Sequence, residues 1–332
     1  MLRRRSILGI VAGAVLAAAV FVVLLTVPSD DFLILPDRAR PTDQLVEVPG
    51  EQTGSGEAGI YMVDVTVGRA SLFERIFHRW LFDGESLVPA RVINPEGVSD
   101  TQRRQSSLNQ MSQSQLIAIT VALRSLGKTV EVRPTGAEVV LVQPGAPADG
   151  KLEVGDVIVE AEGQPVRTTD DLARAASGLT PGDDLTLTVK RGDKRVELTL
   201  PTQASESDPK RAVVGIGVQN AEDYHFPVDV KIDAGSIGGP SAGLAFALDV
   251  VNELGTDLAR GRVIVATGEL TLDGKVLPIG GVKQKAIAAE RAGADLFLVP
   301  DANAAEARAA VDDLEIVPVS TFREAVAALE AR

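Results

Sequence analysis

The stretch that decides the fold reads Ile237-Gly-Gly-Pro-Ser241-Ala-Gly-Leu-Ala-Phe-Ala-Leu248. Two glycines and a proline set a fixed turn, and a serine then stands at the N-terminus of an apolar helix. Such a turn exposes the Ser241 hydroxyl and points backbone N–H groups toward one spot, which suits a developing oxyanion. Because serine is also a common helix cap, this stretch alone leaves a purely structural role for Ser241 open.

A second stretch with a recognisable pattern lies farther along the chain. It reads Ala266-Thr-Gly-Glu-Leu-Thr-Leu-Asp-Gly-Lys-Val-Leu-Pro-Ile-Gly-Gly-Val-Lys283-Gln-Lys285. The sequence has no cysteine, which excludes thiol nucleophiles and thiolate metal sites, and its two histidines leave little material for a histidine-based site. A Ser-His-Asp arrangement through His225 has no motif to support it. Any chemistry must therefore use Ser, Thr, Lys, Asp or Glu side chains.

Together the two stretches resemble the proteolytic domain of the Lon family. In that family the nucleophile is the serine of Gly-Pro-Ser-Ala-Gly and its partner is the second lysine of Gly-Gly-x-Lys-x-Lys, which implies Ser241 and Lys285 here. Lys283, the first lysine of the Gly-Gly-x-Lys-x-Lys motif, is the alternative. A lysine acts as a base only when it is neutral, so we expect Lys285 to be buried against apolar neighbours that lower its pKa.

Residues around this pair are expected to support it. Thr267 matches the threonine that the family places near the dyad lysine. Gly239 and Pro240 shape the turn, and backbone N–H groups around Gly239 and Ser241 are the oxyanion-hole candidates. The family often has an aspartate three residues before the serine, but this sequence has Gly238 there, so no acidic helper carries over.

Residues 139–202 have a different pattern, with short apolar runs separated by Gly- and Pro-containing turns. They resemble a PDZ domain of the bacterial protease-associated kind. The resemblance rests on Gln143-Pro-Gly-Ala-Pro-Ala148, Leu152-Glu-Val-Gly-Asp156-Val-Ile and Gly163-Gln-Pro-Val166. The pattern predicts strand, turn, strand, helix and two further strands. PDZ domains add an extended peptide to a sheet edge.

The peptide-binding residues of this domain are expected just before its first strand, at Gly136, Ala137, Glu138 and Val139. The Gly-Leu-Gly-Phe-like signature that captures a terminal carboxylate is not visible there. A PDZ fold that serves only as a spacer therefore stays open as the alternative.

The N-terminus predicts a membrane anchor. Arg3, Arg4 and Arg5 precede an apolar run from Ile7 to Val27, which is long enough to span a bilayer as a helix. The positive-inside rule then keeps the N-terminus cytoplasmic and places the rest outside the cell membrane. A cleaved signal peptide is the alternative, although its apolar region is usually only about 7–15 residues long.

The expected fold is a Lon-type α/β (α+β) proteolytic domain plus a small mostly-β PDZ domain, preceded by one transmembrane helix. The Met111-Ser-Gln-Ser-Gln115 segment leads into an apolar helix and resembles the first long helix of the Lon proteolytic domain. The PDZ domain is therefore expected to be an insertion. The predicted parts are the stub and helix (1–30), a stem (31–57), the first part of the proteolytic domain (58–130), the PDZ domain (131–203) and the rest of the proteolytic domain (204–332).

The composition and one rejected motif limit which ligands and partners we expect. With 33 basic and 46 acidic residues, the net charge of -13 argues against general nucleic-acid binding. Gly127-Lys128-Thr129 is not a phosphate-binding loop, because that motif needs a glycine where the chain has Ala122. We expect no ATP, no metal and no other cofactor.

Anchor, PDZ segment and catalytic segment together resemble the membrane-anchored, PDZ-containing Lon-like proteases of bacteria. The resemblance implies an ATP-independent serine endopeptidase that uses Ser241 and Lys285 through an acyl-enzyme, with the PDZ domain recruiting or gating unfolded or membrane-associated polypeptides. It also implies a homo-oligomeric ring. The alternative is a catalytically silent, membrane-tethered PDZ adaptor that presents partners to another protease. The sequence does not predict the physiological substrate or the cleavage preference.

Overall fold

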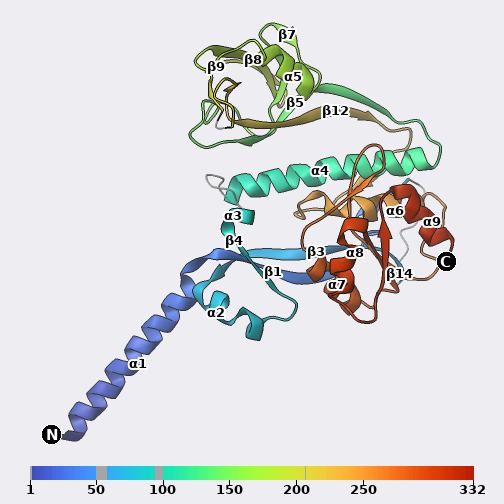
Figure 1. Ribbon diagram of the computed structural model, residues 1–332. Coiled ribbons are helices and arrows are strands. Elements are labelled where there is room, and N and C mark those ends of the chain that lie inside the picture. The colour runs from blue at the N-terminus through green and yellow to red at the C-terminus, as the bar shows by residue number, and fades with distance from the viewer. Residues whose placement is uncertain (1, 50–57, 94–99, 206) are drawn as a thin grey trace.

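Two six-stranded sheets organise the chain (Figure 1). The computed structural model describes residues 2–49, 58–93, 100–205 and 207–332, and for residues 2–12 it describes the backbone alone. One sheet lies in a larger α/β domain with several helices, and the other lies in a smaller, mostly-β domain. This mixed architecture confirms the predicted α/β and mostly-β parts.

The sheet of the larger domain joins strands from both ends of the chain. Its order is β18-β17-β14-β3-β1-β4, in which β3, β14, β17 and β18 are parallel and β1 runs antiparallel to β3 and β4. The strands are β1 (Pro28–Pro41), β3 (Gly59–Ser71), β4 (Ser86–Pro89), β14 (Val263–Ala266), β17 (Leu296–Pro300) and β18 (Glu315–Val319). Ile264 on β14 pairs with Ile60 on β3 and with Leu296 on β17, so segments about 200 residues apart share one sheet.

Much of the segment predicted as a stem, residues 31–57, is part of the sheet in the structure. Residues 28–41, most of which fell in it, form β1, whose Ile34 pairs with Val67 on β3 and with Ser86 on β4. Phe32 and Leu33 are buried there. The prolines and acidic residues of this segment suggested a solvated linker, but pairing on both sides satisfies the backbone of the strand.

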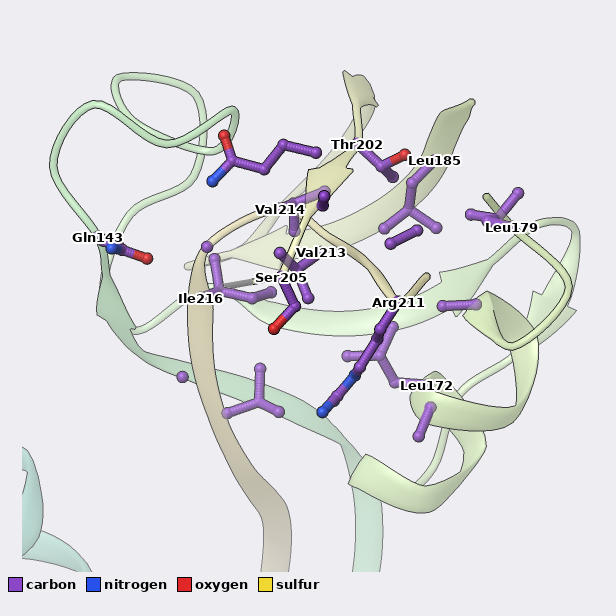
Figure 2. Close-up of a pocket in the computed structure, with 18 of the residues that line it drawn as sticks. Gln143, Leu172, Leu179, Leu185, Thr202, Ser205, Arg211, Val213, Val214 and Ile216 are labelled. Carbon is purple, nitrogen blue, oxygen red and sulfur yellow. The ribbon is translucent and has the colours of Figure 1, made fainter. Parts of the chain in front are cut away.

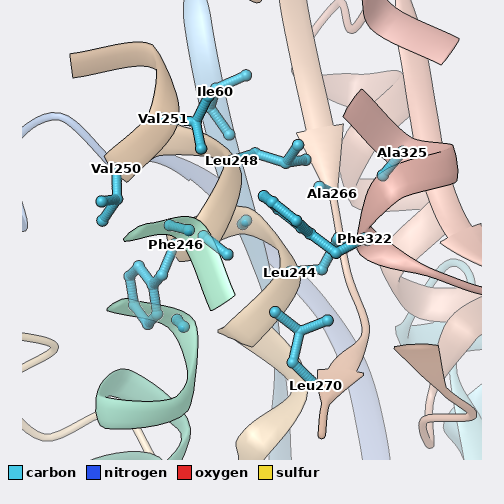
Figure 3. Packing of buried hydrophobic residues seen from close by; sticks show 14 of the residues in the cluster. Ile60, Leu244, Phe246, Leu248, Val250, Val251, Ala266, Leu270, Phe322 and Ala325 are labelled. Carbon is cyan, nitrogen blue, oxygen red and sulfur yellow. The ribbon is translucent and has the colours of Figure 1, made fainter. Parts of the chain in front are cut away.

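Alternating side chains on the central strands bury both faces of this sheet. On β17, Leu296 and Leu298 enter one cluster, whereas Phe297 and Val299 enter the other. The first cluster is filled by α6 (Gly243–Glu253), with α4 (Asp100–Ser125) and α9 (Phe322–Glu330) around it, as Figure 3 shows for Phe246 and its neighbours. The second cluster is covered by α7 (Val282–Arg291) and α8 (Ala304–Arg308). Helix α6, which begins two residues after Ser241, and helix α7, which carries Lys285, thus lie on opposite faces of the sheet.

The smaller domain is a sheet of order β12-β5-β6-β8-β9, with β7 paired to β6. Its elements are β5 (Glu131–Val142), β6 (Val157–Ala161), β7 (Gln164–Pro165), α5 (Thr169–Ala176), β8 (Asp184–Arg191), β9 (Lys194–Pro201) and β12 (Ile216–His225). A core separate from the larger domain includes Val139, Ile158, Leu172 and Leu187. The antiparallel pair of β5 and β12 leads from this core back to α4, as Figure 1 shows.

Short elements complete the described chain. Pairs of short strands are formed by β2 (Val46–Glu47) with β13 (Lys231–Ile232), β10 (Gln203–Ala204) with β11 (Ala212–Val213), and β15 (Glu269–Leu270) with β16 (Val276–Leu277). The short helices are α2 (Leu72–Leu81), α3 (Ala90–Ile93), η1 (Pro240–Ala242) and η2 (Asp301–Asn303).

The N-terminal segment forms helix α1 (Leu2–Thr26), which projects away from both domains (Figure 1). Among the described residues, no helix has the length and apolar character needed to cross a membrane. The predicted transmembrane helix is therefore unconfirmed.

Candidate active site

The turn that carries Ser241 is held by helix α4. The Gly239 N–H donates a hydrogen bond to the Ser107 carbonyl at 2.8 Å, and the Ser114 hydroxyl donates to the Pro240 carbonyl at 2.9 Å. Gly239 has φ +90°, a region open to glycine and strained for other residues. The predicted oxyanion donor at Gly239 is therefore engaged with α4 in this conformation.

The glycine at position 238 also follows from the closeness of α4. A Cβ atom there would lie 2.4 Å from Ser107 Oγ, 3.1 Å from Ser107 Cβ and 3.3 Å from the Ser107 carbonyl carbon, so a side chain would require the Ser107 hydroxyl to turn away and α4 to shift slightly. A glycine therefore fits this position with the least rearrangement, and an acidic group near the pair comes from another element, Asp64 on β3.

Lys285 and Ser241 meet although they are 44 residues apart in sequence. Lys285 Nζ lies 2.6 Å from Ser241 Oγ and 3.0 Å from Thr267 Oγ1. The protonated amine donates both hydrogen bonds, and the neutral amine can accept the hydroxyl proton of Ser241. Thr267 donates its own hydroxyl hydrogen to the Ser241 carbonyl at 3.1 Å, so it orients both members of the pair.

The surroundings of Lys285 favour its neutral form. The side chain is only 3% exposed, and burial lowers its pKa from 10.5 to about 8. The carboxylate of Asp64, on β3, acts in the opposite direction and raises the Lys285 pKa. Burial also raises the pKa of Asp64, while Lys285 and Arg40 lower it. The result is a lysine that titrates near physiological pH.

The alternative lysine has a different contact. Lys283 is two residues before Lys285 on α7, but its Nζ donates to the Glu85 carbonyl at 3.0 Å. The intervening Gln284 donates to the Gly84 carbonyl at 3.0 Å and to Ser86 Oγ at 2.8 Å. Consecutive side chains of α7 thus divide between the candidate site and the loop before β4, and Lys283 contributes to that loop.

His225 lies away from any triad-like arrangement. Its ring Nδ1 is 3.8 Å from Asp223 on the same strand, β12, and both side chains are exposed. The residues that the structure describes include no group of three or more His, Asp or Glu side chains placed to hold a metal ion.

The PDZ-like domain has a pocket of about 650 Å³ between α5 and residues 211–218 (Figure 2). Its lining is largely apolar and includes Leu172, Leu185, Val214 and Ile216, and Arg211 is among its polar residues. A concave apolar groove with a few polar groups is a typical peptide or small-ligand site.

The peptide-binding residues predicted in this domain lie elsewhere. Gly136, Ala137, Glu138 and Val139 are on β5, a strand that pairs with β12 on one side and with β6 on the other. Ala137 and Val139 are fully buried. A peptide cannot add to an edge that is already paired, so the structure places the open groove at the other end of the domain sequence.

A sequence signal for the groove exists at Gly215-Ile216-Gly217-Val218, which alternates glycine and apolar residues as the PDZ signature does. It was missed because it follows the domain's last strands in sequence instead of preceding the first. Asp64 was missed for another reason: it is one acidic residue in an apolar strand, and only the fold brings β3 beside α7. Ser114 lies in the Met111–Gln115 segment that predicted a helix, but neither it nor Ser107 was predicted to contact the Ser241 turn.

Comparison with known proteins agrees with both parts of this description. Residues 179–330 match the family model of the Lon protease C-terminal proteolytic domain, and residues 111–202 match the PDZ domain model. The ranges overlap at 179–202, where β8 and β9 belong to the smaller sheet.

The curated relatives are Lon proteases. That of Roseiflexus castenholzii is 36% identical over 152 residues, which cover 42% of this chain and 18% of that protein. That of Azorhizobium caulinodans is 29% identical over 255 residues, which cover 74% of this chain and 28% of that protein. The chain therefore spans less than a third of the length of these relatives.

Among solved structures, the PDZ domain of the SdrC-like protein from Listeria innocua is 26% identical and covers 27% of this chain and 97% of that one, with a TM-score of 0.23. A solution structure from Geobacillus thermodenitrificans is 30% identical and covers 25% of this chain and 97% of that one, with a TM-score of 0.24. At these TM-scores neither likeness supports a conclusion about this chain.

Proposed function

We propose that this chain, which contains a Lon-type proteolytic domain and a PDZ domain, is an ATP-independent serine endopeptidase that acts through Ser241 and Lys285. The observation that carries the proposal is the 2.6 Å approach of the buried Lys285 amine to the Ser241 hydroxyl. Homology to Lon proteases supports the broader assignment to serine peptidases.

The proposed reaction is peptide-bond hydrolysis in two steps. Neutral Lys285 accepts the hydroxyl proton while Ser241 Oγ bonds to the scissile carbonyl carbon, and the ammonium then protonates the departing amine to leave an acyl-enzyme. A water molecule attacks the ester, again with Lys285 as base, and releases the second product and the free Ser241. Thr267 holds the amine in line through its 3.0 Å contact.

The oxyanion in this reaction needs backbone donors at the turn. The Ser241 N–H is a candidate, and the Gly239 N–H becomes another when its bond to the Ser107 carbonyl is released. A shift of the turn relative to α4 is therefore part of the proposal, and substrate binding is the event that drives it.

We also propose that the PDZ domain is inserted within the proteolytic domain and recruits flexible polypeptides through the pocket beside α5. Support for the insertion comes from β3, before the PDZ domain, which pairs with β14, after it. Support for recruitment comes from the apolar groove at Leu172 and Ile216. The proposed substrates are unfolded or tail-like polypeptides, and a ring of copies would enclose the sites.

The proposed location is the outer face of the cell membrane, with α1 as the anchor and the N-terminus in the cytoplasm. It is supported by the arginines that precede the apolar run and by the exposed apolar side chains of α1, among them Leu16, Val20 and Phe21.

Incubation of the full chain with casein, without ATP, tests the proposed activity. Wild type and three variants are compared by mass spectrometry of the fragments: Ser241→Ala, Lys285→Met and, as the matched control on the same helix, Lys283→Met. We expect cleavage by wild type and Lys283→Met and none by the other two. Cleavage that survives in Ser241→Ala would refute the assignment, and a wild type that binds casein without cleaving it would favour the adaptor.

A further inference from the structure

Helix α2 carries its apolar side chains outward. Phe73, Ile76, Phe77, Trp80 and Leu81 follow the i, i+3, i+4, i+7, i+8 spacing and form one stripe along the helix, the outer stripe. Trp80 is 90% exposed and Ile76 is 62% exposed, and no residue of the helix is buried. An amphipathic helix on the surface of a soluble domain turns such a stripe toward the core, so α2 is oriented the opposite way.

Polar contacts fix this orientation. Arg75 Nε lies 2.9 Å from Asp31 on β1, and His78 Nδ1 lies 2.9 Å from Glu85 just before β4. The polar side of α2 is thus held against the larger domain. Because the helix is attached through its polar side, the outer stripe is presented as a fixed surface.

The outer stripe begins where α1 ends. The Leu72 N–H donates to the Val27 carbonyl at 3.0 Å, which ties the first residue of α2 to the residue after α1. The rings of Phe21 on α1 and Phe73 on α2 meet edge to face at 5.5 Å, and Phe77 follows 4.8 Å from Phe73. The apolar surface of α1 therefore continues onto α2, and Figure 1 shows α2 beside the junction of α1 with the sheet.

We propose that the outer stripe lies in the interfacial layer of the bilayer that holds α1, so that the chain meets lipid through two helices. The inference rests on the proposed membrane anchor. If α1 spans the bilayer, the bond between Leu72 and Val27 sets α2 at the depth of the headgroups. Amphipathic helices bury their apolar face about 5–10 Å into that boundary, and a tryptophan such as Trp80 prefers it.

This arrangement orients the catalytic domain. Because α2 connects β3 to the loop before β4, a lipid-bound α2 holds one end of the sheet against the membrane. The loop at Gly84, Glu85 and Ser86 accepts hydrogen bonds from α7, the helix of Lys285. The proposed peptidase would therefore work at a fixed distance from the membrane surface, on chain segments that emerge from it.

The test uses Trp80, the one tryptophan of the sequence. The full chain is reconstituted in phosphatidylcholine–phosphatidylglycerol vesicles, and Trp80 emission is measured with aqueous iodide and with lipids brominated at shallow or deep acyl positions. We expect a blue-shifted emission, loss of most iodide quenching, and stronger quenching by shallow than by deep bromines.

Two variants distinguish insertion of the outer stripe into lipid from a nonspecific effect of a new surface charge. Ile76→Asp should reduce bromolipid quenching of Trp80 several-fold, whereas Val92→Asp, which changes a 65% exposed apolar residue outside the outer stripe, should leave it unchanged. Vesicle flotation reports the anchor separately.

The remaining outcomes are distinguishable. Floating protein whose Trp80 stays red-shifted and open to iodide would overturn the inference while leaving the anchor intact. A blue-shifted Trp80 without bromolipid quenching would also overturn it, since the stripe would then be covered by protein, such as a second copy. Protein that does not float would remove the anchor and the inference together, but leave the casein test of peptidase activity unaffected.

Discussion

The activity of the proposed peptidase should follow the ionisation of Lys285. Burial lowers the pKa of this lysine from 10.5 to about 8, because its 3% exposed side chain has lost most of its contact with water. Only the neutral amine can take the proton of Ser241. The pH dependence of kcat/KM for a peptide substrate is therefore a direct readout of the buried lysine.

The structure gives the size of the effect. Lowering the pKa from 10.5 to about 8 raises the neutral fraction at pH 7 roughly 300-fold, to about one molecule in ten. Below about pH 8 the rate constant should therefore rise close to tenfold for each pH unit, and above it the curve should level off. The Asp64 carboxylate raises the Lys285 pKa, so Asp64→Asn should move the rising limb to lower pH.

The assay is cleavage of a fluorogenic peptide by the full chain between about pH 5.5 and 9.5, with wild type and Asp64→Asn in parallel. Denaturation is monitored by circular dichroism at each pH, so that a fall in rate is not mistaken for titration. A profile that is level between about pH 6 and 9 would refute a lysine base, provided that chemistry limits the rate. A movement of the Asp64→Asn profile to higher pH would refute the electrostatic role of Asp64.

The other predictions concern stability and binding. Lys285→Met should raise the free energy of unfolding by up to about 3 kcal/mol at pH 7. The pKa of Lys285 is 10.5 in the unfolded chain and about 8 in the folded one. Below about pH 8 the lysine is protonated in both states and its burial destabilises the fold fully, and this cost fades as the pH rises to about 10.5. Urea titrations should therefore show a larger stability gain of Lys285→Met over wild type at pH 7 than at pH 10. Ser114→Ala removes the hydrogen bond to the Pro240 carbonyl and should lower the free energy of unfolding by about 1 kcal/mol. It should also lower kcat, because α4 then holds the Ser241 turn less firmly. A kcat equal to that of wild type would contradict this role of α4. Ala173→Trp fills the pocket beside α5 and should weaken binding of an unfolded polypeptide in a pull-down while Arg174→Trp, on the neighbouring position outside that pocket, does not.

The candidate catalytic residues could be predicted from the sequence because they lie in short local motifs. The Gly-Gly-Pro-Ser turn and the Lys-x-Lys stretch each lie at the start of a helix, and it was their resemblance to the Lon family that implied Ser241, Thr267 and Lys285. The structure brings these three residues into contact. The alternation of apolar and polar residues at 59–67 is likewise typical of a strand, and the structure contains it in β3.

Long-range pairing was not predictable from these patterns. Residues 28–41 became a sheet strand because β3 and β4 flank them, and nothing local in a Pro- and Asp-containing segment indicates two such partners. Asp64 approaches Lys285 only through the packing of α7 on β3. Peptide-binding residues were predicted at 136–139 because these residues stand at the first strand of the domain. In the structure β5 is paired on both sides there, and the pocket lies beside residues 211–218.

The central claim is that Ser241 is the nucleophile, and trapping the acyl-enzyme tests it most directly. The full chain is mixed with an activated peptide ester without ATP, quenched in acid during turnover, and mapped by mass spectrometry after digestion. The account predicts one adduct, with the mass of the acyl group, on the peptide that contains Ser241, and no adduct in Ser241→Ala. Turnover by Ser241→Ala, or an acyl group found reproducibly on another residue, would contradict it.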